Sequence, residues 1–535
     1  MRYLEVVIRV KEENGEMVTE TPLNTHRLEM LDLLSVPRQE RIDQLEADTL
    51  EKGREIMRTI FLKQWELLDR VLASSRQHIN QDCQAVFDGK TDLKIASRLG
   101  ILHLGQQVCY CKSCQTHFLP LTLVLPEHQG MIITRGLQEW TCLLPQELPF
   151  ATAARLLGWQ TQEEQVISDT EVRYLVQEYG QAIRQAELAE VKALEAREDI
   201  SELKPNLVPL ETPRRHPAWP AELSAAVEAA METSAPTPPK GVSRADWERV
   251  LAYQQEARQE ALQQEEGEMT LLEEKPLTDP AHPAQPDLSR LGPEVRPGQI
   301  VAATDEVKVR APKKRQWQEL RTARVTTPQG YRYLSGTGET FLAQLSLFLM
   351  LCAGPRQGLL TFLGDGARWI RDFFQKTVVP LWQQAEMILD WYHLKNKCYQ
   401  LTSMICRGRK LKKDLLKALL KFLWNGQVDS ALALLENYRP QAKNEEKLDE
   451  LIEYIRKNRQ GEAIPNYCER REHRQFNGSA HAEKANDLLV ARRQKHRGMH
   501  WSLETSDALC ALKTLMLNGG WDLYWQRGQV LPLAS

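Results

Sequence analysis

The first part of the chain spaces its hydrophobic residues as helices do. Residues 25–79 place Leu, Ile, Met and Trp at helical intervals among charged residues, with an interruption at Pro37. This pattern predicts one or two long helices and a helical N-terminal region over residues 1–100. A β-like apolar run follows in VCYCKSCQTHFLPLTLVLP, residues 108–126, and indicates a small separate module over residues 101–147.

The next pattern predicts two helices within residues 148–200. An Ala- and Leu-rich helix ends at Gly158, and Ser168 with Glu171 gives the capping box of a second helix, which continues as a charged extension over 181–199. Two helices joined by a glycine-containing turn are typical of a helix-turn-helix-like DNA-binding module, with Arg173 of the second helix expected to contact DNA. A plain helical hairpin has the same spacing, so both interpretations stay open.

Proline usage changes after residue 200. Of the 27 prolines, 14 fall within residues 201–300, beside acidic helical pieces such as ADWERVLAYQQEARQEALQQEEGE. Because proline-rich segments do not build a continuous packed core, residues 201–297 are predicted to be an acidic linker with one embedded helix.

From residue 298 the pattern is that of strands. GQIVAATDEVKV predicts a strand through Asp305, and WQELRTARVTT and YRYLSGT predict two more, joined by a turn at residues 328–330. A buried helix, FLAQLSLFLMLCAG, precedes a strand that ends at Asp365 and a fifth strand that ends at Asp390. This order is expected of a ribonuclease-H-like α/β domain, here residues 298–535, in which Asp305 and Asp365 lie side by side. The whole chain is therefore predicted to be a multidomain α+β protein.

Two segments of this domain lack strand character. Residues 394–470 are rich in Leu and Lys and predict an all-helical insertion. NGSAHAEKANDLLVARRQKHRGMHWS, residues 477–502, places Glu483 in the first turns of a helix. The next turns carry a basic stripe, consisting of Arg492, Arg493, Lys495 and Arg497. A carboxylate beside such a stripe suits a group that holds a cation while its neighbours hold phosphates.

Composition and charge narrow the classes of function. A length of 535 residues allows about three domains. The net charge of −3 divides into −16 over residues 1–300 and +13 over 301–535, so the C-terminal half would attract a polyanion. The apolar runs are too short for a membrane span, and the first residues lack the apolar core of a signal peptide, so a cytoplasmic protein is expected.

Four clustered residues near the middle of the N-terminal half are candidate zinc ligands. Cys109, Cys111, Cys114 and His117 have the spacing of one knuckle of a zinc ribbon. No second C-x2-C pair lies nearby in the sequence; Cys83, His103 and Cys142 are more distant. Bound zinc and a degenerate ribbon that keeps its fold without metal are both compatible with this spacing.

The motifs of the C-terminal domain together resemble a known family. TDEV, FLGDGARWI, ILDWYHL and NGSAHAEKAN with RRQKHRGMHWS are similar to the DDE transposases of bacterial insertion sequences. The resemblance is closest to the ISKra-type group, which is distantly related to Mutator-like elements. It covers roughly residues 295–505.

The resemblance implies a catalytic triad of Asp305, Asp365 and Glu483, with Glu469, Glu472 and Asp487 as nearby substitutes for the last. Asp390 and His393 match a (C/D)-x-x-H element that supports the site in related superfamilies. Two Mg²⁺ or Mn²⁺ ions held by these carboxylates would serve strand cleavage and strand transfer. Such enzymes act on double-stranded transposon ends and target DNA, commonly as homo-oligomers, which suggests a prokaryotic, nucleoid-associated protein.

Basic residues of the same domain are expected to contact phosphates. Besides the stripe after Glu483 they are Lys313, Lys314, Arg315, Arg368, Arg407, Arg409 and Lys410. Two alternatives to an active transposase stay open. One is a ribonuclease-H-like nuclease without strand transfer, and the other is a transposase-derived DNA-binding protein that has lost catalysis.

Overall fold

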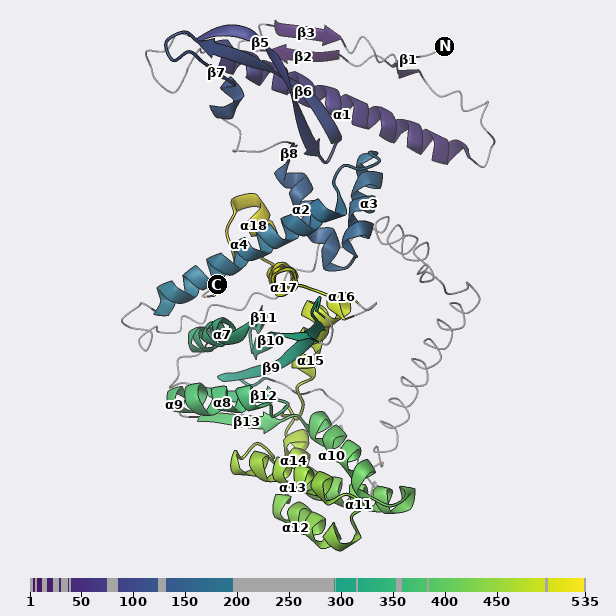
Figure 1. Cartoon of the computed structure of the whole chain (residues 1–535), viewed down its shortest axis with the longest axis vertical. Helices are drawn as coiled ribbons and strands as arrows, with labels where there is room; N and C mark the ends of the chain where they lie inside the picture. The colour runs from purple at the N-terminus through teal and green to yellow at the C-terminus, as the bar shows by residue number, and fades with distance from the viewer. Residues whose placement is uncertain are drawn as a thin grey trace, which may run out of the picture. The chain divides into compact units, whose positions relative to one another are not determined.

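The computed structural model has a mixed α+β architecture that divides into two compact units, Met1–Tyr179 and Gly180–Ser535 (Figure 1). The structure describes strand segments within residues 3–29 and residues 37, 40–74, 85–123, 131–195, 293, 295–313, 316–352, 358–382, 384–495 and 499–533. The linker predicted over 201–297 falls almost entirely outside them. The boundary between the units lies inside one helix, so residues 180–195 belong to the C-terminal unit, which the sequence analysis begins only at residue 298.

The N-terminal unit contains more β-structure than its sequence pattern predicts. The short pairs β1 (Tyr3–Leu4) with β4 (Leu28–Glu29), and β2 (Val7–Lys11) with β3 (Met17–Pro22), precede one long helix, α1 (Arg41–Ser74). A four-stranded sheet follows in the order β7-β6-β5-β8. Its strands are β5 (Ala85–Ser97), β6 (Gly100–Cys111), β7 (Thr116–Phe118) and β8 (Ile132–Ile133). The expectation of a helical region over residues 1–100 is therefore wrong outside α1. Residues 85–97 form β5 and residue 100 begins β6, and the residues of these strands alternate between buried and more exposed positions, as in a strand with one face packed on a helix.

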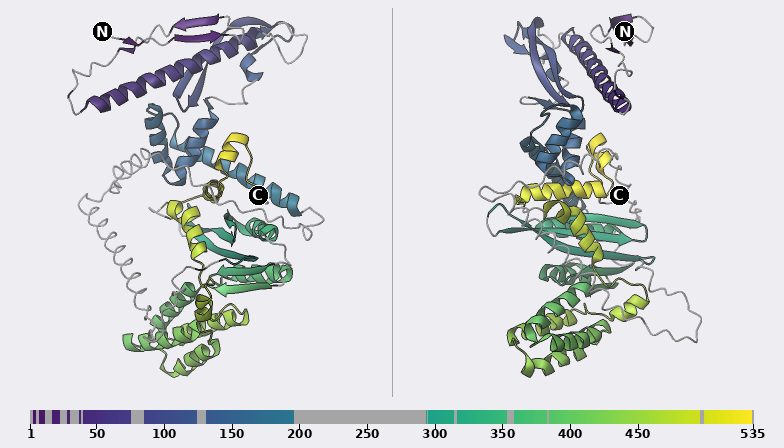
Figure 2. Two further views of the ribbon diagram at one scale, coloured as in Figure 1. Left: turned by 180° about the vertical axis from the view of Figure 1, so that it is seen from behind. Right: turned by 90° about the vertical axis from the view of Figure 1, so that its right-hand side faces the viewer.

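The helix α1 packs on this sheet along one face. Trp65 lies among Leu93, Ile95 and Leu102 in a small core of its own, and its indole nitrogen donates to the carbonyl of Gly105. The right-hand view of Figure 2 shows α1 running along the sheet.

Helices complete the N-terminal unit. They are η1 (Pro120–Leu123), α2 (Arg135–Leu143), η2 (Leu144–Gln146), α3 (Phe150–Thr161) and the first part of α4 (Asp169–Glu195). The capping box of α4 is confirmed: the Ser168 amide donates to Glu171 and the Glu171 amide donates to the Ser168 hydroxyl. The prediction that α3 ends at Gly158 is wrong. The helix continues to Thr161, and Gly158 allows the chain to fold back, since a Cβ there would lie 2.7 Å from the Glu163 carbonyl oxygen.

A five-stranded mixed sheet organises the C-terminal unit. Its strands are β9 (Gln299–Arg310), β10 (Trp317–Thr327), β11 (Gly330–Gly336), β12 (Leu359–Gly364) and β13 (Gln384–Leu389), in the order β11-β10-β9-β12-β13. The first three are antiparallel, while β12 pairs in parallel with both β9 and β13. The buried helix predicted between the third and fourth strands is α7 (Gly338–Cys352).

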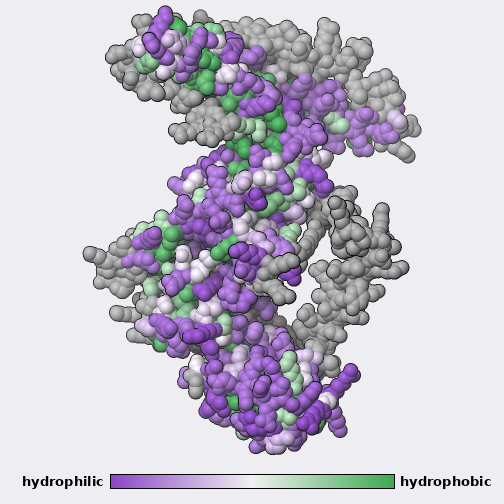
Figure 3. Space-filling view, in the orientation of Figure 1, coloured by the Kyte–Doolittle hydropathy of each residue, from purple (hydrophilic) through white to green (hydrophobic). Residues whose placement is uncertain are grey.

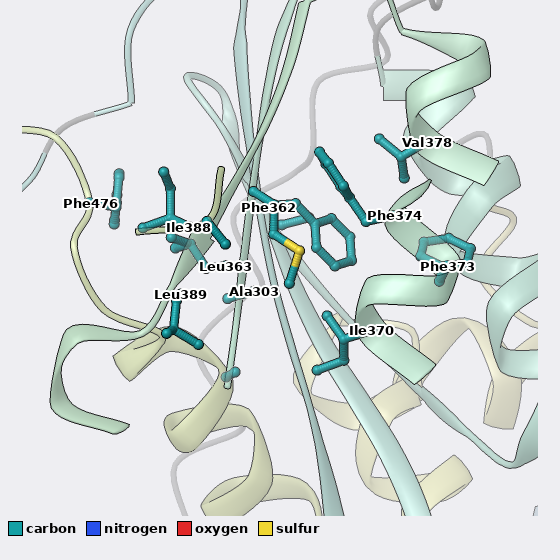
Figure 4. Close-up of a cluster of buried hydrophobic side chains, with 14 of the residues drawn as sticks. Ala303, Phe362, Leu363, Ile370, Phe373, Phe374, Val378, Ile388, Leu389 and Phe476 are labelled. Atoms are coloured by element: carbon teal, nitrogen blue, oxygen red, sulfur yellow. The ribbon is translucent and has the colours of Figure 1, made fainter. Parts of the chain in front are cut away.

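Helices cover both faces of this sheet. On one face lie α7, α8 (Arg368–Phe373), the π-helical turn η4 (Phe374–Val378) and α9 (Val379–Leu381). Figure 4 shows Phe362 of β12 directed toward Phe373 and Phe374, whose ring centroids lie 5.8 and 5.9 Å away. Leu363, the next residue of β12, lies toward Ile388 and Phe476 in the same figure. This alternation packs a core on each side of the parallel strands.

A helical insertion lies beyond β13, as the sequence predicts. It consists of α10 (Trp391–Ile405), α11 (Arg409–Trp424), α12 (Val428–Tyr438), η5 (Arg439–Gln441), α13 (Glu445–Gln460) and α14 (Tyr467–Glu472). Trp391, Trp424 and Tyr467 form an aromatic centre, and the Tyr467 hydroxyl donates to the Leu389 carbonyl at the end of β13. The face of the insertion seen in Figure 3 is mostly hydrophilic.

The chain then returns to the second face of the sheet. Here lie α15 (Ala480–Asn486), the π-helical turn η6 (Asp487–Ala491), α16 (Arg492–Gln494) and α17 (Leu503–Leu517), followed by α18 (Trp521–Arg527). The second half of α4 packs against α17, because a Cβ on Gly180 would lie 2.5 Å from the Cα of Ala508. Arg184 of α4 pairs with Asp507 at 3.0 Å and donates to the Ser335 hydroxyl. Within the described ranges, no helix has both the length and the apolar character needed to cross a membrane.

Candidate active site beside the parallel strands

Three aspartates occupy one edge of the parallel part of the sheet. Ala303 of β9 pairs with Leu363 of β12, so Asp305 and Asp365 come two residues after that pair. Gly364 of β12 pairs with Leu389 of β13, so Asp365 and Asp390 each follow one residue later. The register therefore brings three residues that are far apart in the sequence to the same level.

Asp305 is held in a defined orientation. Its Oδ1 accepts from the Glu306 amide at 2.7 Å, and its Oδ2 accepts from Nδ2 of Asn486 at 2.6 Å. Burial and the neighbouring carboxylate of Asp365 raise the pKa of Asp305 to about 7, although both hydrogen bonds act in the opposite direction. The two aspartates are thus close enough for their charges to repel each other.

The Gly-Asp-Gly motif explains how Asp365 leaves its strand. A Cβ on Gly364 would lie 2.9 Å from Ile370, so the glycine lets α8 pack on the strand end. Gly366 has a φ of 81°, in the region that favours glycine, and a Cβ there would lie 2.8 Å from Leu389. Between them, the Asp365 carboxylate accepts from the Ala367 amide at 2.8 Å.

Asp390 is buried, and its carboxylate joins the end of β13 to the loop before α15, a contact that we call the clamp. Its exposed fraction is 1%, and Oδ1 accepts from the His393 amide at 2.9 Å as the N-cap of α10. Its Oδ2 accepts from both the amide and the hydroxyl of Ser479. Because Ser479 directly precedes α15, this clamp fixes the start of the helix that carries Glu483.

Glu483 lies in the first turn of α15 with its side chain exposed. Its pKa is raised by partial burial and by the Asp390 carboxylate, while His393 lowers it. Asp390 and His393, the two residues expected to support the site, are therefore close enough to Glu483 for their charges to affect its protonation. His393 itself is exposed at the start of α10.

The structure brings the expected triad only partly together. Asp305 and Asp365 are neighbours, and Glu483 lies one helical turn before Asn486, which binds Asp305. In the part of the chain that the structure describes, no three His, Cys, Asp or Glu side chains converge closely enough to hold one metal ion. The donor set nevertheless suits a hard divalent cation, because paired carboxylates that repel each other are relieved by a positive charge between them.

Two residues of the site are absent from the sequence analysis. Asn486 donates to Asp305 and accepts from the Thr322 hydroxyl at 2.5 Å, which fixes the orientation of its amide. Its position three residues after Glu483, on the same helical face, is the signal that could have revealed it. Trp369 donates to the Glu306 carboxylate at 2.8 Å, so the FLGDGARWI and TDEV motifs are physically joined.

Most of the expected phosphate contacts that the structure describes are exposed. These are Arg173, Lys313, Arg368, Arg407, Arg409, Lys410, Arg492 and Lys495. Lys314, Arg315 and Arg497 lie outside the described residues. Arg492 pairs with Asp487 at 3.2 Å, and Arg368 lies 3.8 Å from Asp372.

Arg493 is an exception, and its expected contact with phosphate needs correction. Its exposed fraction is 7%, its guanidinium lies 4.8 Å from the centroid of the Trp501 ring, and it donates to the Met499 sulfur. The π-helical turn η6 precedes it, and the wider turn rotates the following residues about the helix axis relative to an uninterrupted α-helix. The basic stripe expected from helical spacing is therefore divided between the surface and the interior.

The candidate zinc ligands of the N-terminal unit lie on two faces of the β6–β7 hairpin. Cys109 and Cys111 are buried, whereas His117 pairs across the hairpin with Tyr110, the residue between the two cysteines. Because neighbouring strand residues point to opposite faces, His117 is on the side away from both. Its ring nitrogen Nε2 lies 2.5 Å from Asp88. Cys114 is exposed in the turn, and its amide donates to the Cys111 sulfur.

Comparison with known proteins adds one similarity. The profile of an uncharacterised protein family (UPF0236) matches residues 332–527, from β11 to α18. The matched stretch contains Asp365, Asp390 and Glu483, but it begins after Asp305. No curated protein matches the chain. The C-terminal region is thus similar to a family that has a defined sequence pattern and no assigned activity.

Proposed function

We propose that the protein is a DDE-type DNA transposase that cleaves and transfers DNA strands at the ends of an insertion sequence. The observation that carries this proposal is that Asp305, in the middle of β9, lies level with Asp365 at the end of the adjacent parallel strand β12, with α15 and its Glu483 attached to Asp305 through Asn486. Acidic side chains on a rigid sheet edge, next to exposed basic residues, suit metal-assisted displacement at phosphorus.

The strand order supports a ribonuclease-H-like fold for this unit. The fold requires three antiparallel strands followed by two parallel ones, with the first strand in the centre, and β11-β10-β9-β12-β13 has this order. The helical insertion between β13 and α15 also stands where the resembling transposases have one, before the last acidic residue.

The carboxylates of Asp305, Asp365 and Glu483 would hold Mg²⁺ or Mn²⁺. Two such ions supply activation of the attacking oxygen and stabilisation of the leaving oxygen. The chain itself orients these groups. Asn486 and the Glu306 amide fix Asp305, and the clamp of Asp390 on Ser479 fixes the first turn of α15. Asp390 is therefore a positioning residue in this proposal.

Exposed basic residues would bind the DNA backbone around this edge. Arg368 begins α8, directly after the Gly-Asp-Gly turn, and Arg409 and Lys410 begin α11 in the insertion. In the N-terminal unit, α4 exposes Arg173 and Tyr174 in its first turns, as a helix that enters a major groove would. These contacts position the duplex, and base readout by α4 would choose the inverted repeat.

Purified protein, Mg²⁺ and a labelled duplex from the ends of the element that surrounds the gene would test the proposal. Strand cleavage followed by joined product supports it. Nicking without joining favours a nuclease, and a gel shift without cleavage favours a DNA-binding protein that has lost catalysis. Asp429→Asn serves as matched control, since Asp429 is an exposed residue of the insertion paired with Arg459.

A further inference from the structure

The long helix α1 exposes a second apolar face beside the one packed on its sheet. Six large apolar side chains of this helix are each between 41% and 79% exposed: Ile42, Leu45, Leu50, Met57, Leu68 and Val71. With 100° between successive residues, all six fall within a sector about 140° wide, and the packed Trp65 lies outside it. We call this sector the apolar face of α1. Exposed apolar residues gathered on one side of a helix mark an interaction site.

Along the apolar face, residues at equal distances on either side of its middle are mostly similar in size and polarity. Ile42 and Val71 are equally far from the middle of the face, which lies near Met57, and so are Leu45 and Leu68. Ile60, also exposed, mirrors Gly53, around whose Cα no atom would meet an added Cβ within 4 Å. The uncharged polar residues of the face, Thr49 and Gln64, mirror each other as well. Large positions mirror large ones at the two ends of the face, and near the centre a large one mirrors a small one, whereas Leu50 mirrors Lys63 and Glu46 mirrors Leu67.

Charge is distributed unequally along the same helix. Residues 41–51 carry a net charge of −3, and residues 52–74 carry +2. Two copies side by side in the same direction would place like charge against like. In opposite directions, the acidic beginning of each helix would lie along the basic end of the other. Glu46, which together with Lys63 is charged within the apolar face, would lie beside the basic half of its partner.

We propose that α1 is a homodimerisation helix, which pairs antiparallel with α1 of a second copy of this chain around a two-fold axis near Met57. A two-fold interface requires a surface that is complementary to itself, and the mirrored pattern with opposite end charges meets this requirement. The contact runs from Ile42 to Val71, about 44 Å at 1.5 Å per residue. This inference concerns a surface of the N-terminal unit and does not depend on the proposed strand transfer.

The mass of the full-length protein in solution, without DNA, tests the pairing. Sedimentation is expected to give about 123 kDa, twice the 61.5 kDa of one chain. Met57→Lys should reduce it to one chain, because two lysines would meet near the axis. Leu411→Lys is the matched control, since Leu411 is similarly exposed on α11, and should leave the dimer intact. A single-chain mass for the unaltered protein would overturn the proposal, as would a Met57→Lys variant that stays dimeric with its circular dichroism unchanged.

Disulfide trapping tests the direction. With Cys114 changed to Ser, the double variant Ile42→Cys and Val71→Cys should form a covalent dimer on mild oxidation, because each new thiol lies level with the other type on the partner. Ile42→Cys alone should remain a single chain, since antiparallel copies separate its two thiols by about 44 Å. A covalent dimer of Ile42→Cys alone would instead show parallel helices and overturn the antiparallel pairing.

Discussion

The aspartates beside the parallel strands are far apart in the sequence and close together in the structure, whereas the candidate ligands of the β6–β7 hairpin are close in the sequence and lie on different faces. Asp305, Asp365 and Asp390 are spread over 85 residues, yet strand register brings them level. Cys109 and His117 are only eight residues apart, yet the hairpin places them on opposite faces. Clustering in sequence is therefore weak evidence for a shared site, whereas position within a sheet is strong evidence. The experiments below test this contrast.

Asp365→Asn is expected to have the largest effect. It removes a carboxylate charge from the sheet edge and should lower the cleavage rate by about 10³-fold, roughly 4 kcal/mol of transition-state stabilisation, while binding of the DNA ends stays nearly unchanged. Single-turnover cleavage and gel shifts on the same duplex measure the two effects separately. Equal loss of binding would make Asp365 a structural residue.

Asp390→Ala should have the second-largest effect on cleavage. The change leaves the amide and hydroxyl of Ser479 and the His393 amide without their acceptor, so we expect a loss of about 2 kcal/mol or more in stability of the C-terminal unit. Cleavage should fall by about 10- to 100-fold, as for residues that orient metal ligands. Asp390→Asn, which keeps one acceptor oxygen, should recover part of both. A variant with unchanged melting and full cleavage would refute the role as a clamp.

Asn486→Ala should be milder. It removes the amide that joins α15 to Asp305 and should lower cleavage by about tenfold, with little change in DNA affinity. Titration of Mg²⁺ in the cleavage assay should show a weaker apparent metal affinity. Asp429→Asn, in the insertion and exposed, is again a suitable control. An unchanged metal dependence would remove Asn486 from the site.

Arg492 is exposed and its neighbour Arg493 is buried, so substitutions of the two should have different effects. Arg492→Gln should weaken binding to all DNA sequences and reduce the slope of log affinity against log salt by about 1. Arg493→Gln should instead lower the melting temperature, because its guanidinium packs on Trp501. If both variants changed the salt slope equally, the burial of Arg493 would not persist in the DNA complex.

The smallest effect is expected in the hairpin. Cys109→Ser together with His117→Ala should leave cleavage unchanged, and a metal chelator should not shift the melting of the N-terminal unit beyond the effect of the substitutions themselves. Metal analysis of the unaltered protein gives the same information directly. One zinc ion per chain that disappears in the double variant would mean that the hairpin rearranges to gather these ligands.

The sequence predicts the C-terminal sheet well and its details less well. Apolar runs such as LLTFLG, ended by glycine, favour buried strands, so the order of elements and the place of Asp365 directly after its strand follow from the sequence pattern. Arg493 was misplaced because helical spacing does not reveal a π-helical turn. Gly158 was misread as a helix end because a glycine needed for close packing resembles one needed for a cap. Asn486 contacts Asp305 across 181 residues of sequence, so the local pattern offers only its place on the same helical face as Glu483 and does not identify its partner.

Asp390 and Ser479 are 89 residues apart, and they mark the two ends of the helical insertion. One carboxylate therefore joins the point where the chain leaves the sheet to the point where it returns. The part of the insertion that does not contact the sheet could change in length without displacing Glu483, provided that both ends stay joined and that Tyr454 and Tyr467 keep their bonds to the Asp365 and Leu389 carbonyls. A protein engineer could therefore attach a different DNA-binding or partner-binding module to the side of the insertion away from the sheet, while Tyr454 and Tyr467 keep their contacts with the strand ends.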